Sequence, residues 1–503
     1  MKGTIMVQGT ASSVGKSVLC AALCRILKQD GFKAAPFKSQ NMALNSFVTA
    51  DGLEMGRAQV SQAEAAGLAP QVEMNPVLLK PTSDQGSQVI VMGKAVGNMK
   101  AMDYMQWKEE LLPVIDEAFA KLSGEHDVIV IEGAGSPAEI NLRDKDLVNM
   151  GLASRLQAPV LLAGDIDRGG VFASLYGTVE LLLPEERNLV KGLIINKFRG
   201  DPEVLRPGLG QLEDLVNIPV LGVIPYIHLN LDDEDSVTDK FSNRSNDRAL
   251  KIQVIQLPRI SNFTDFNPLE LHDDVNLTYI REPRELNSPD LLIIPGSKNT
   301  IEDLLHLKKK GWEESIRDYA ASGGLLIGIC GGFQMLGRKV LDPDGVESTE
   351  PEVDGFNLLP LNTIMAAEKS TRQVEAIWRY RDHSFFSAMG EEEPLTGYEI
   401  HMGRTEYHGV KHPVYLKTME QWEGAVNVAG NVFGTYMHGI FDNFSWTNKL
   451  LNGLRRRRGL SEQDSTLPGT YQDFKEQEYD RLADLVRENL DMEQVYRIIK
   501  KEV

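Results

Sequence analysis

The chain has 503 residues, more than one hydrophobic core accommodates, so we expect two or three domains. Its formal net charge of -19 excludes a general nucleic-acid binder, because such proteins need a basic face that neutralises phosphates. No apolar stretch approaches about 18 residues, so neither a transmembrane helix nor a membrane partner is expected. The three cysteines, Cys20, Cys24 and Cys330, are too few for a disulfide framework and are typical of a cytoplasmic protein.

The first half alternates apolar strand patterns with amphipathic helix patterns. Residues 4–7 predict a short strand, and residues 18–27 place apolar side chains on one helical face before Gly31 ends the helix. Nearly all-apolar runs, typical of parallel strands that are covered on both faces, lie at 128–131, 159–163 and 192–195. This order predicts a doubly wound α/β domain.

A glycine-rich loop joins the first strand to the first helix. Its leading glycine, Gly9, lies one residue earlier than in the usual G-x-x-x-x-G-K-[ST] loop, but the chemistry is the same. Backbone amides can turn toward phosphate oxygens at the helix N-terminus, Lys16 can reach the β- and γ-phosphates, and the Ser17 hydroxyl can bind Mg²⁺. We therefore expect ATP to be held by Thr10, Ser13, Val14, Gly15, Lys16 and Ser17.

The spacing of this loop resembles the dethiobiotin synthetase-like branch of P-loop enzymes, which phosphorylate a carboxylate or carbamate. In that branch a Glu-Gly-Ala-Gly segment after a buried strand supplies a metal ligand, and here this segment begins at Glu132. The resemblance implies that Glu132 binds Mg²⁺ with Ser17; the alternative is that it only pairs with Lys16. Glu54 falls where the branch has another metal-binding acid, although the start of a surface helix fits equally. Asn196, at a strand end, falls at an adenine-reading position.

A polar stretch separates the two halves of the chain. Residues 231–236 are acidic and residues 242–247 are turn-rich, so neither could fill a core. A second α/β series begins at 251–255 and continues with strand patterns at 290–294 and 324–329, and the chain is helical and charged beyond Asn443. The sequence thus predicts an ATP-dependent domain at 1–235, a second α/β domain at 250–445 and a C-terminal helical extension at 446–503.

Cys330 lies between small residues on a predicted strand-to-helix turn. At such a turn a thiol gains room for substrate, the dipole of the helix and backbone amides that can act as oxyanion donors. Gly331 would supply one amide, and the loop after Gly296 would supply the second. His438 lies in a strand-to-turn context suited to a base. An inert buried cysteine and a structural histidine are the alternative, but the joint placement of these residues favours a nucleophilic site.

The second half resembles a class I glutamine amidotransferase domain, which has a flavodoxin-like α/β fold and releases ammonia from L-glutamine. That family usually carries a glutamate two residues after the histidine, and here this position is Ile440. The cobalamin-type branch of the family is similar in lacking the acid. The group that orients His438 is therefore left open.

A dethiobiotin synthetase-like domain followed by such a glutaminase resembles enzymes of cobalamin synthesis. The motifs at 38–46, 75–81 and 165–172 resemble those of the cobyric acid synthase family. The resemblance implies that ATP and glutamine are used to amidate four carboxylates (b, d, e and g) of (adenosyl)cobyrinic acid a,c-diamide through acyl phosphates. On the same analogy, contacts to the corrinoid would come from Asn41, Asn45, Lys80 and Asp146.

Two other interpretations stay open at this point. A cobyrinic acid a,c-diamide synthase, or a related tetrapyrrole amidase, would share both halves and differ in its product. A ParA-like ATP switch belongs to another class, carries a lysine where this chain has Ala11 and has no use for Cys330. The sequence indicates neither the oligomeric state nor the order of amidations, the need for the adenosyl ligand or the route of ammonia.

Overall fold

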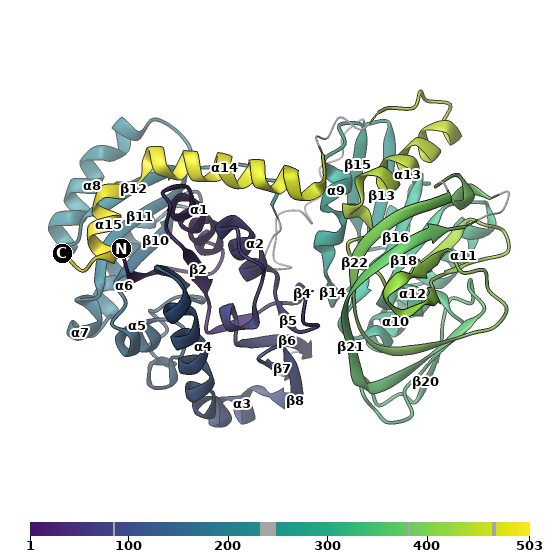
Figure 1. The fold of residues 1–503 in the computed structure, drawn as a ribbon, viewed down its shortest axis with the longest axis horizontal. Helices are drawn as coiled ribbons and strands as arrows, with labels where there is room; N and C mark the ends of the chain where they lie inside the picture. The colour runs from purple at the N-terminus through teal and green to yellow at the C-terminus, as the bar shows by residue number, and fades with distance from the viewer. Residues whose placement is uncertain (84–85, 232–247, 381–383, 390, 465–468) are drawn as a thin grey trace.

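The computed structural model describes residues 1–503 except 84–85, 232–247, 381–383, 390 and 465–468 (Figure 1). The polar stretch that was predicted between the two halves lies almost entirely in the second of these gaps, outside the described residues. Among the described residues, no helix combines the length and apolar character needed to cross a membrane.

The first half is built on a six-stranded parallel sheet in the order β12-β11-β10-β1-β9-β2. Its strands are β1 (Gly3–Gly9), β2 (Ala34–Phe37), β9 (Val128–Glu132), β10 (Val160–Asp165), β11 (Val190–Phe198) and β12 (Val220–Pro225). Every residue of β9 and β10 is buried, which confirms strands covered on both faces. The doubly wound prediction is therefore confirmed, and the carboxyl ends of the strands meet at one edge.

Helices cover both faces of this sheet. On one face lies α1 (Lys16–Gln29), which packs against α2 (Arg57–Ala66). The other face is covered by α4 (Leu112–Glu125), α5 (Met150–Leu156), α6 (Val171–Leu181) and α8 (Pro202–Val216), and the short α7 (Pro184–Arg187) follows α6.

Between β2 and β9 the chain leaves the main sheet and forms small structures that the sequence did not predict. A four-stranded sheet consists of β3 (Gln40–Met42), β6 (Val77–Ser83), β7 (Gly86–Val91) and β8 (Lys94–Lys100), followed by α3 (Ala101–Trp107). A two-stranded pair, β4 (Ser46–Val48) and β5 (Glu54–Gly56), lies toward the second half (Figure 1). These elements carry the motifs at 38–46 and 75–81.

The second half has its own six-stranded sheet in the order β15-β13-β16-β18-β26-β25, parallel except for β25. Its strands are β13 (Leu250–Ile255), β15 (Val275–Ile280), β16 (Leu291–Ile294), β18 (Leu326–Ile329), β25 (Ala425–Val426) and β26 (Val432–Thr435). Between these strands the chain forms α9 (Asn267–Glu270), α10 (Thr300–Lys309), α11 (Trp312–Ala321) and α12 (Gly331–Leu336). A short pair, β14 (Ile260–Ser261) and β17 (Gly296–Ser297), lies at the strand ends.

A second, largely antiparallel sheet flanks this domain. Its two long strands, β21 (Leu361–Arg379) and β22 (Glu391–Tyr407), pair along most of their length. The shorter strands are β19 (Lys339–Leu341), β20 (Glu352–Asp354), β23 (Val414–Leu416) and β24 (Gln421–Glu423). This sheet faces the β4–β5 pair of the first half, and contacts between them join the two halves.

The C-terminal helices divide between the two halves. Helix α13 (Phe444–Arg457) packs Trp446 and Leu450 into the second core. Helices α14 (Tyr471–Asn489) and α15 (Met492–Ile499) return to the first half, as Figure 1 shows. Arg25 of α1 pairs with Glu476 at 2.6 Å and with Asp480 at 2.7 Å. The end of the chain therefore ties the two domains together.

Candidate active sites

Cys330 stands on a strained turn between β18 and α12. Its φ of 50° is unusual for a residue with a side chain, and such strain is typical of a nucleophile elbow. A Cβ at Gly332 would lie 2.0 Å from the Ile294 carbonyl oxygen, so only glycine lets the helix start so close to β16. The turn thus holds the buried thiol at the carboxyl edge of the sheet.

His438 is held by a carboxylate that the sequence interpretation missed. Its Nδ1 lies 2.6 Å from Oδ2 of Asp265, and the Gly439 amide donates to Oδ1 of the same side chain at 3.1 Å. The imidazole ring and the carboxylate are both buried. Burial opposes the charged form of His438, but Asp265 and Cys330 raise its pKa to about 10. The imidazolium is therefore the stable form, with Nδ1 donating to Asp265.

Asp265 lies 173 residues before His438, in a 3₁₀ turn (Phe263–Phe266) that follows β13 and β14. The position where the common family pattern has its acid is Ile440, which is fully buried. A usable signal was present in the sequence: Asp265 is the one acidic residue in the Phe-Thr-Asp-Phe segment, shortly after a strand pattern. Because parallel strands end at one edge, such a residue can approach His438.

The two glycines predicted to serve the oxyanion both lie close to the Cys330–His438 site. A Cβ at Gly331 would lie 2.8 Å from the Ser297 amide nitrogen, and a Cβ at Gly296 would lie 3.2 Å from Cε1 of His438. Gly296 and Ser297 form β17, so this loop is fixed by pairing with β14. The oxyanion role of these positions stays a prediction.

The phosphate loop follows β1 as expected and is braced by its neighbours. Lys16 donates to the carbonyl oxygens of Ala11 and Gly135, both at 3.0 Å. Gly15 precedes α1 with φ 96°, and a Cβ there would lie 2.3 Å from the Asn196 amide nitrogen. Asn196 in turn donates to the Val14 carbonyl at 2.8 Å. Asn196 therefore contacts the loop itself, and a contact with adenine stays a prediction.

The outer part of the loop is fixed in the same way. The Thr10 amide donates to the Ala163 carbonyl at 2.9 Å, which ties the loop to the end of β10. Ser13 has φ 60°, and its carbonyl accepts a hydrogen bond from Lys197 at 2.5 Å. Lys197 also pairs with Asp165 at 2.9 Å. The loop is thus anchored to the ends of β10 and β11.

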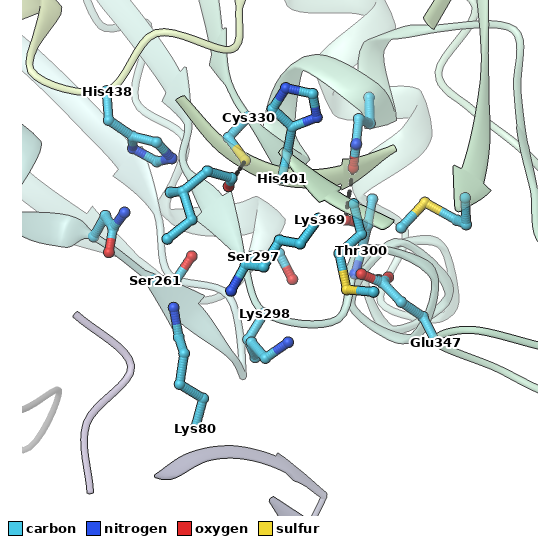
Figure 2. Close-up of a pocket in the computed structure, with 15 residues that line it drawn as sticks. Lys80, Ser261, Ser297, Lys298, Thr300, Cys330, Glu347, Lys369, His401 and His438 are labelled. Atoms are coloured by element: carbon cyan, nitrogen blue, oxygen red, sulfur yellow. Dashed lines mark hydrogen bonds between the residues drawn. The ribbon is translucent and has the colours of Figure 1, made fainter. Parts of the chain in front are cut away.

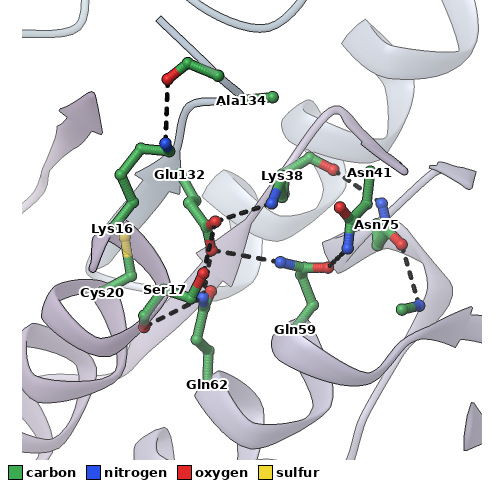
Figure 3. A network of polar contacts seen from close by, with 12 residues as sticks. Lys16, Ser17, Cys20, Lys38, Asn41, Gln59, Gln62, Asn75, Glu132 and Ala134 are labelled. Carbon is green, nitrogen blue, oxygen red and sulfur yellow. Dashed lines mark hydrogen bonds and ion pairs between the residues drawn. The ribbon is translucent and has the colours of Figure 1, made fainter. Parts of the chain in front are cut away.

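Glu132 and Ser17 are brought together at the end of β9, as Figure 3 shows. The Ser17 hydroxyl donates to Oε1 of Glu132 at 2.9 Å, and Lys38 pairs with the same oxygen at 2.8 Å. Gln62 and Gln59 donate to Oε2 at 2.5 and 3.4 Å. A hydroxyl beside a carboxylate is an oxygen pair suited to Mg²⁺, which takes one or two carboxylates with water and phosphate. Among the described residues, no group of three or more His, Cys, Asp or Glu side chains is placed to hold a metal ion.

Comparison with known proteins agrees with this pair of sites. Residues 5–235 match the CobQ/CobB/MinD/ParA nucleotide binding domain, and residues 251–446 match the CobB/CobQ-like glutamine amidotransferase domain. Proteins named cobyric acid synthase match over the full length. The relative from Clostridium botulinum (strain Loch Maree / Type A3) is 53% identical over 98% of this chain and 99% of its own. Those from Clostridium tetani and Alkaliphilus metalliredigens are 52% identical, over 98% and 99% of this chain and 98% and 100% of their own.

The chain belongs to the cobyric acid synthase family. It is therefore a glutamine-dependent ligase of cobalamin biosynthesis that uses ATP, and its two halves are a synthetase half and a glutaminase half. The expectation of a P-loop domain followed by an amidotransferase domain is confirmed.

Beside the phosphate loop the synthetase half has a large hollow with an empty volume of about 1720 Å³, the part open to solvent included. Loop residues from Thr10 to Ser12 form one wall, and β6, β7 and α3 form another. Asp146 lines it, but its carboxylate accepts the amides of Val148, Asn149 and Gly151, each at 2.9 Å. Asp146 thus shapes the loop that borders the hollow.

Asn41 and Asn45 are not among the residues that line this hollow. Asn41 is buried and donates to Oε1 of Gln59 at 3.0 Å, which joins it to the Glu132 network. The Asn45 carbonyl accepts the amide of Arg57 at 3.3 Å. Both asparagines thus contact α2, and their contacts with the corrinoid stay a prediction.

Lys80 and Glu54 occupy a place that the sequence interpretation did not foresee. Lys80 lines the pocket of Cys330 in the glutaminase half, and it donates to Oε1 of Glu54 at 2.9 Å. Lys369 of β21 donates to Oε2 of the same carboxylate at 2.5 Å. Burial opposes ionisation of Glu54, but Lys369 and Lys80 hold its pKa well below the ordinary value. Both carboxylate oxygens thus face lysines, which does not fit the predicted metal ligand at Glu54.

Proposed function

We propose that this chain converts (adenosyl)cobyrinic acid a,c-diamide to cobyric acid by amidating its b, d, e and g carboxylates. The observation that carries this proposal is the joint presence of a Cys330–His438–Asp265 site and a Lys16–Ser17–Glu132 site in one chain of this family. The hollow beside the phosphate loop has the size to admit a macrocyclic substrate.

In the glutaminase half, the Cys330 thiolate attacks the side-chain amide carbon of glutamine. The amides of Gly331 and of the loop after Gly296 stabilise the oxyanion that forms. His438 gives its proton to the leaving nitrogen, ammonia departs, and a glutamyl thioester stays on the sulfur. Water activated by His438 hydrolyses the thioester to glutamate, while Asp265 keeps the ring oriented throughout.

In the synthetase half, a substrate carboxylate oxygen attacks the γ-phosphorus of ATP, which gives an acyl phosphate and ADP. Ammonia then attacks the acyl carbon, and inorganic phosphate leaves as the amide forms. Lys16 stabilises the charge that develops on the transferring phosphoryl group. Mg²⁺, held by Ser17 and Glu132, would screen the negative charge of the phosphates.

Mass spectrometry after incubation with cobyrinic acid a,c-diamide, ATP, Mg²⁺ and glutamine tests this function. We expect a product that carries four new amides, with glutamate and ADP formed in step with them. A chain that left this substrate unchanged, but added two amides to cobyrinic acid, would be an a,c-diamide synthase and would contradict the proposal.

A further inference from the structure

The pocket around Cys330 contains charged side chains that the mechanism above does not use. Three lysines line it: Lys298 and Lys369 of the glutaminase half and Lys80 of the synthetase half (Figure 2). Glu347 lines the same pocket. The side chain of glutamine needs only the thiol, the histidine and the oxyanion donors, so these charges are available to the other end of the substrate.

Lys298 differs from the other two lysines of this pocket. Lys80 and Lys369 are satisfied by Glu54, at 2.9 and 2.5 Å. In the part of the chain that the structure describes, the Lys298 ammonium has no hydrogen bond or ion pair, although its side chain points into the pocket. Burial lowers the pKa of Lys298, and Lys369 and Lys80 lower it further. A bound anion would offset both effects.

Glu347 is the acidic counterpart of Lys298 on the same wall. Its Oε2 accepts the Thr300 amide at 2.8 Å, so the carboxylate is fixed at the start of α10. Burial raises the pKa of Glu347 to about 7, with Lys298 opposing this shift. A cation at this position would favour the ionised carboxylate. The wall therefore presents one ammonium and one carboxylate, which can pair with the α-carboxylate and the α-ammonium of a free amino acid.

We propose that the amino-acid end of glutamine binds at this wall, with its α-carboxylate on Lys298 and its α-ammonium on Glu347, and that Lys80 completes the wall from the synthetase half. This inference rests on the proposed glutaminase function. The Ser46 amide donates to the Asn262 side chain at 3.0 Å, and the Thr371 hydroxyl donates to the Gly52 carbonyl at 2.7 Å, so the two halves are fixed against each other here. Glutamine binding then requires the docked synthetase half.

Ammonia release by the full chain, measured with glutamine and with two truncated analogues that carry the same side-chain amide, tests the proposal. The analogue 4-aminobutanamide lacks the α-carboxylate, and 5-amino-5-oxopentanoate lacks the α-amine. Lys298→Met should raise KM for glutamine roughly 10- to 100-fold, since a charge-assisted contact is lost, and leave KM for 4-aminobutanamide nearly unchanged. Glu347→Gln should raise KM for glutamine and spare 5-amino-5-oxopentanoate. Lys80→Met should raise KM for glutamine several-fold.

The matched control is Lys309→Met, a change at an exposed lysine of α10, and its KM for glutamine should equal that of the unmodified chain. If Lys298→Met hydrolysed glutamine with an unchanged KM for glutamine, the inference would be overturned and the proposed glutaminase function would stand. Should Lys298→Met fail to fold, the unmodified chain decides: equal kcat/KM for glutamine and 4-aminobutanamide would overturn it. Absence of ammonia release from glutamine by the unmodified chain would instead overturn the proposed function.

Discussion

The two active sites differ in how much of their chemistry is present before substrate arrives. At the glutaminase site the backbone of Cys330 is already strained, and His438 is already held as an imidazolium by Asp265. At the phosphate loop, Lys16 donates to backbone carbonyls, and Lys38 pairs with Glu132. A thiol must be activated in advance, whereas phosphoryl transfer uses charges that arrive with nucleotide and metal.

The largest effect is expected at the phosphate loop. Lys16→Met should abolish amide formation with glutamine and with free ammonium, because both nitrogen sources share phosphoryl transfer. Loss of a preorganised charge there costs about 3 kcal/mol or more, roughly a hundredfold in rate. Product formation with each nitrogen source is the measurement, and near-normal turnover would remove the loop from the mechanism.

Asp265→Asn tests whether the glutaminase site is activated in advance. Without the carboxylate, the pKa of His438 should fall, and the imidazolium that protonates the leaving ammonia should be less populated near neutral pH. We expect glutamate release to decrease roughly a hundredfold or more, as for loss of an orienting carboxylate in a catalytic triad. Synthesis with ammonium as nitrogen source is the control. Normal glutamate release across the pH range would mean that Asp265 is only structural.

The contact between His438 and Asp265 also predicts that the stability of the fold depends on pH. The folded pKa of His438, about 10, lies above its ordinary value of 6.5, so its contribution is complete below about pH 6.5 and is lost as pH rises toward 10. Between these pH values the free energy of unfolding should therefore fall further in the unmodified chain than in Asp265→Asn. The difference between the two total decreases should be on the order of a few kcal/mol. Denaturant titrations at several pH values measure both slopes, and parallel curves would contradict the assignment.

The smallest effect is expected at the metal. Glu132→Gln keeps the shape of the side chain and removes the charge that a hard cation requires. The Mg²⁺ concentration for half-maximal synthesis should rise roughly tenfold, while glutamine hydrolysis persists. An unchanged Mg²⁺ titration would assign Glu132 to structure, through Lys38 and Gln62.

What the sequence predicted well depends on local pattern. The strands at 128–131 and 192–195 were found because buried parallel strands are almost wholly apolar, and the loop before α1 was found because phosphate binding needs glycine and lysine at fixed spacing. The structure confirms the two strands as members of one parallel sheet and places the loop at the carboxyl edge of that sheet.

What the sequence did not predict depends on distant contacts. Asp265 reaches His438 through the alignment of strand ends, and no spacing rule joins residues 173 positions apart. The sequence interpretation made Glu54 a metal ligand and Lys80 a corrinoid contact. The docking of the two halves instead places Lys80 in the Cys330 pocket and pairs Glu54 with Lys80 and Lys369. In the same way, the charged pattern of α14 indicates a helix with one buried face and does not say that this face covers α1.

The measurement that tests the division of labour most directly is product formation by Cys330→Ala with glutamine and, separately, with concentrated ammonium chloride at pH about 8.5, where free ammonia becomes appreciable. We predict that glutamine-dependent amidation is abolished, because no thioester can form, and that ammonium-dependent amidation continues, because ammonia enters at the acyl phosphate. His438→Ala should show the same split less completely. Normal use of glutamine by Cys330→Ala, or loss of both nitrogen sources in a folded variant, would contradict the account.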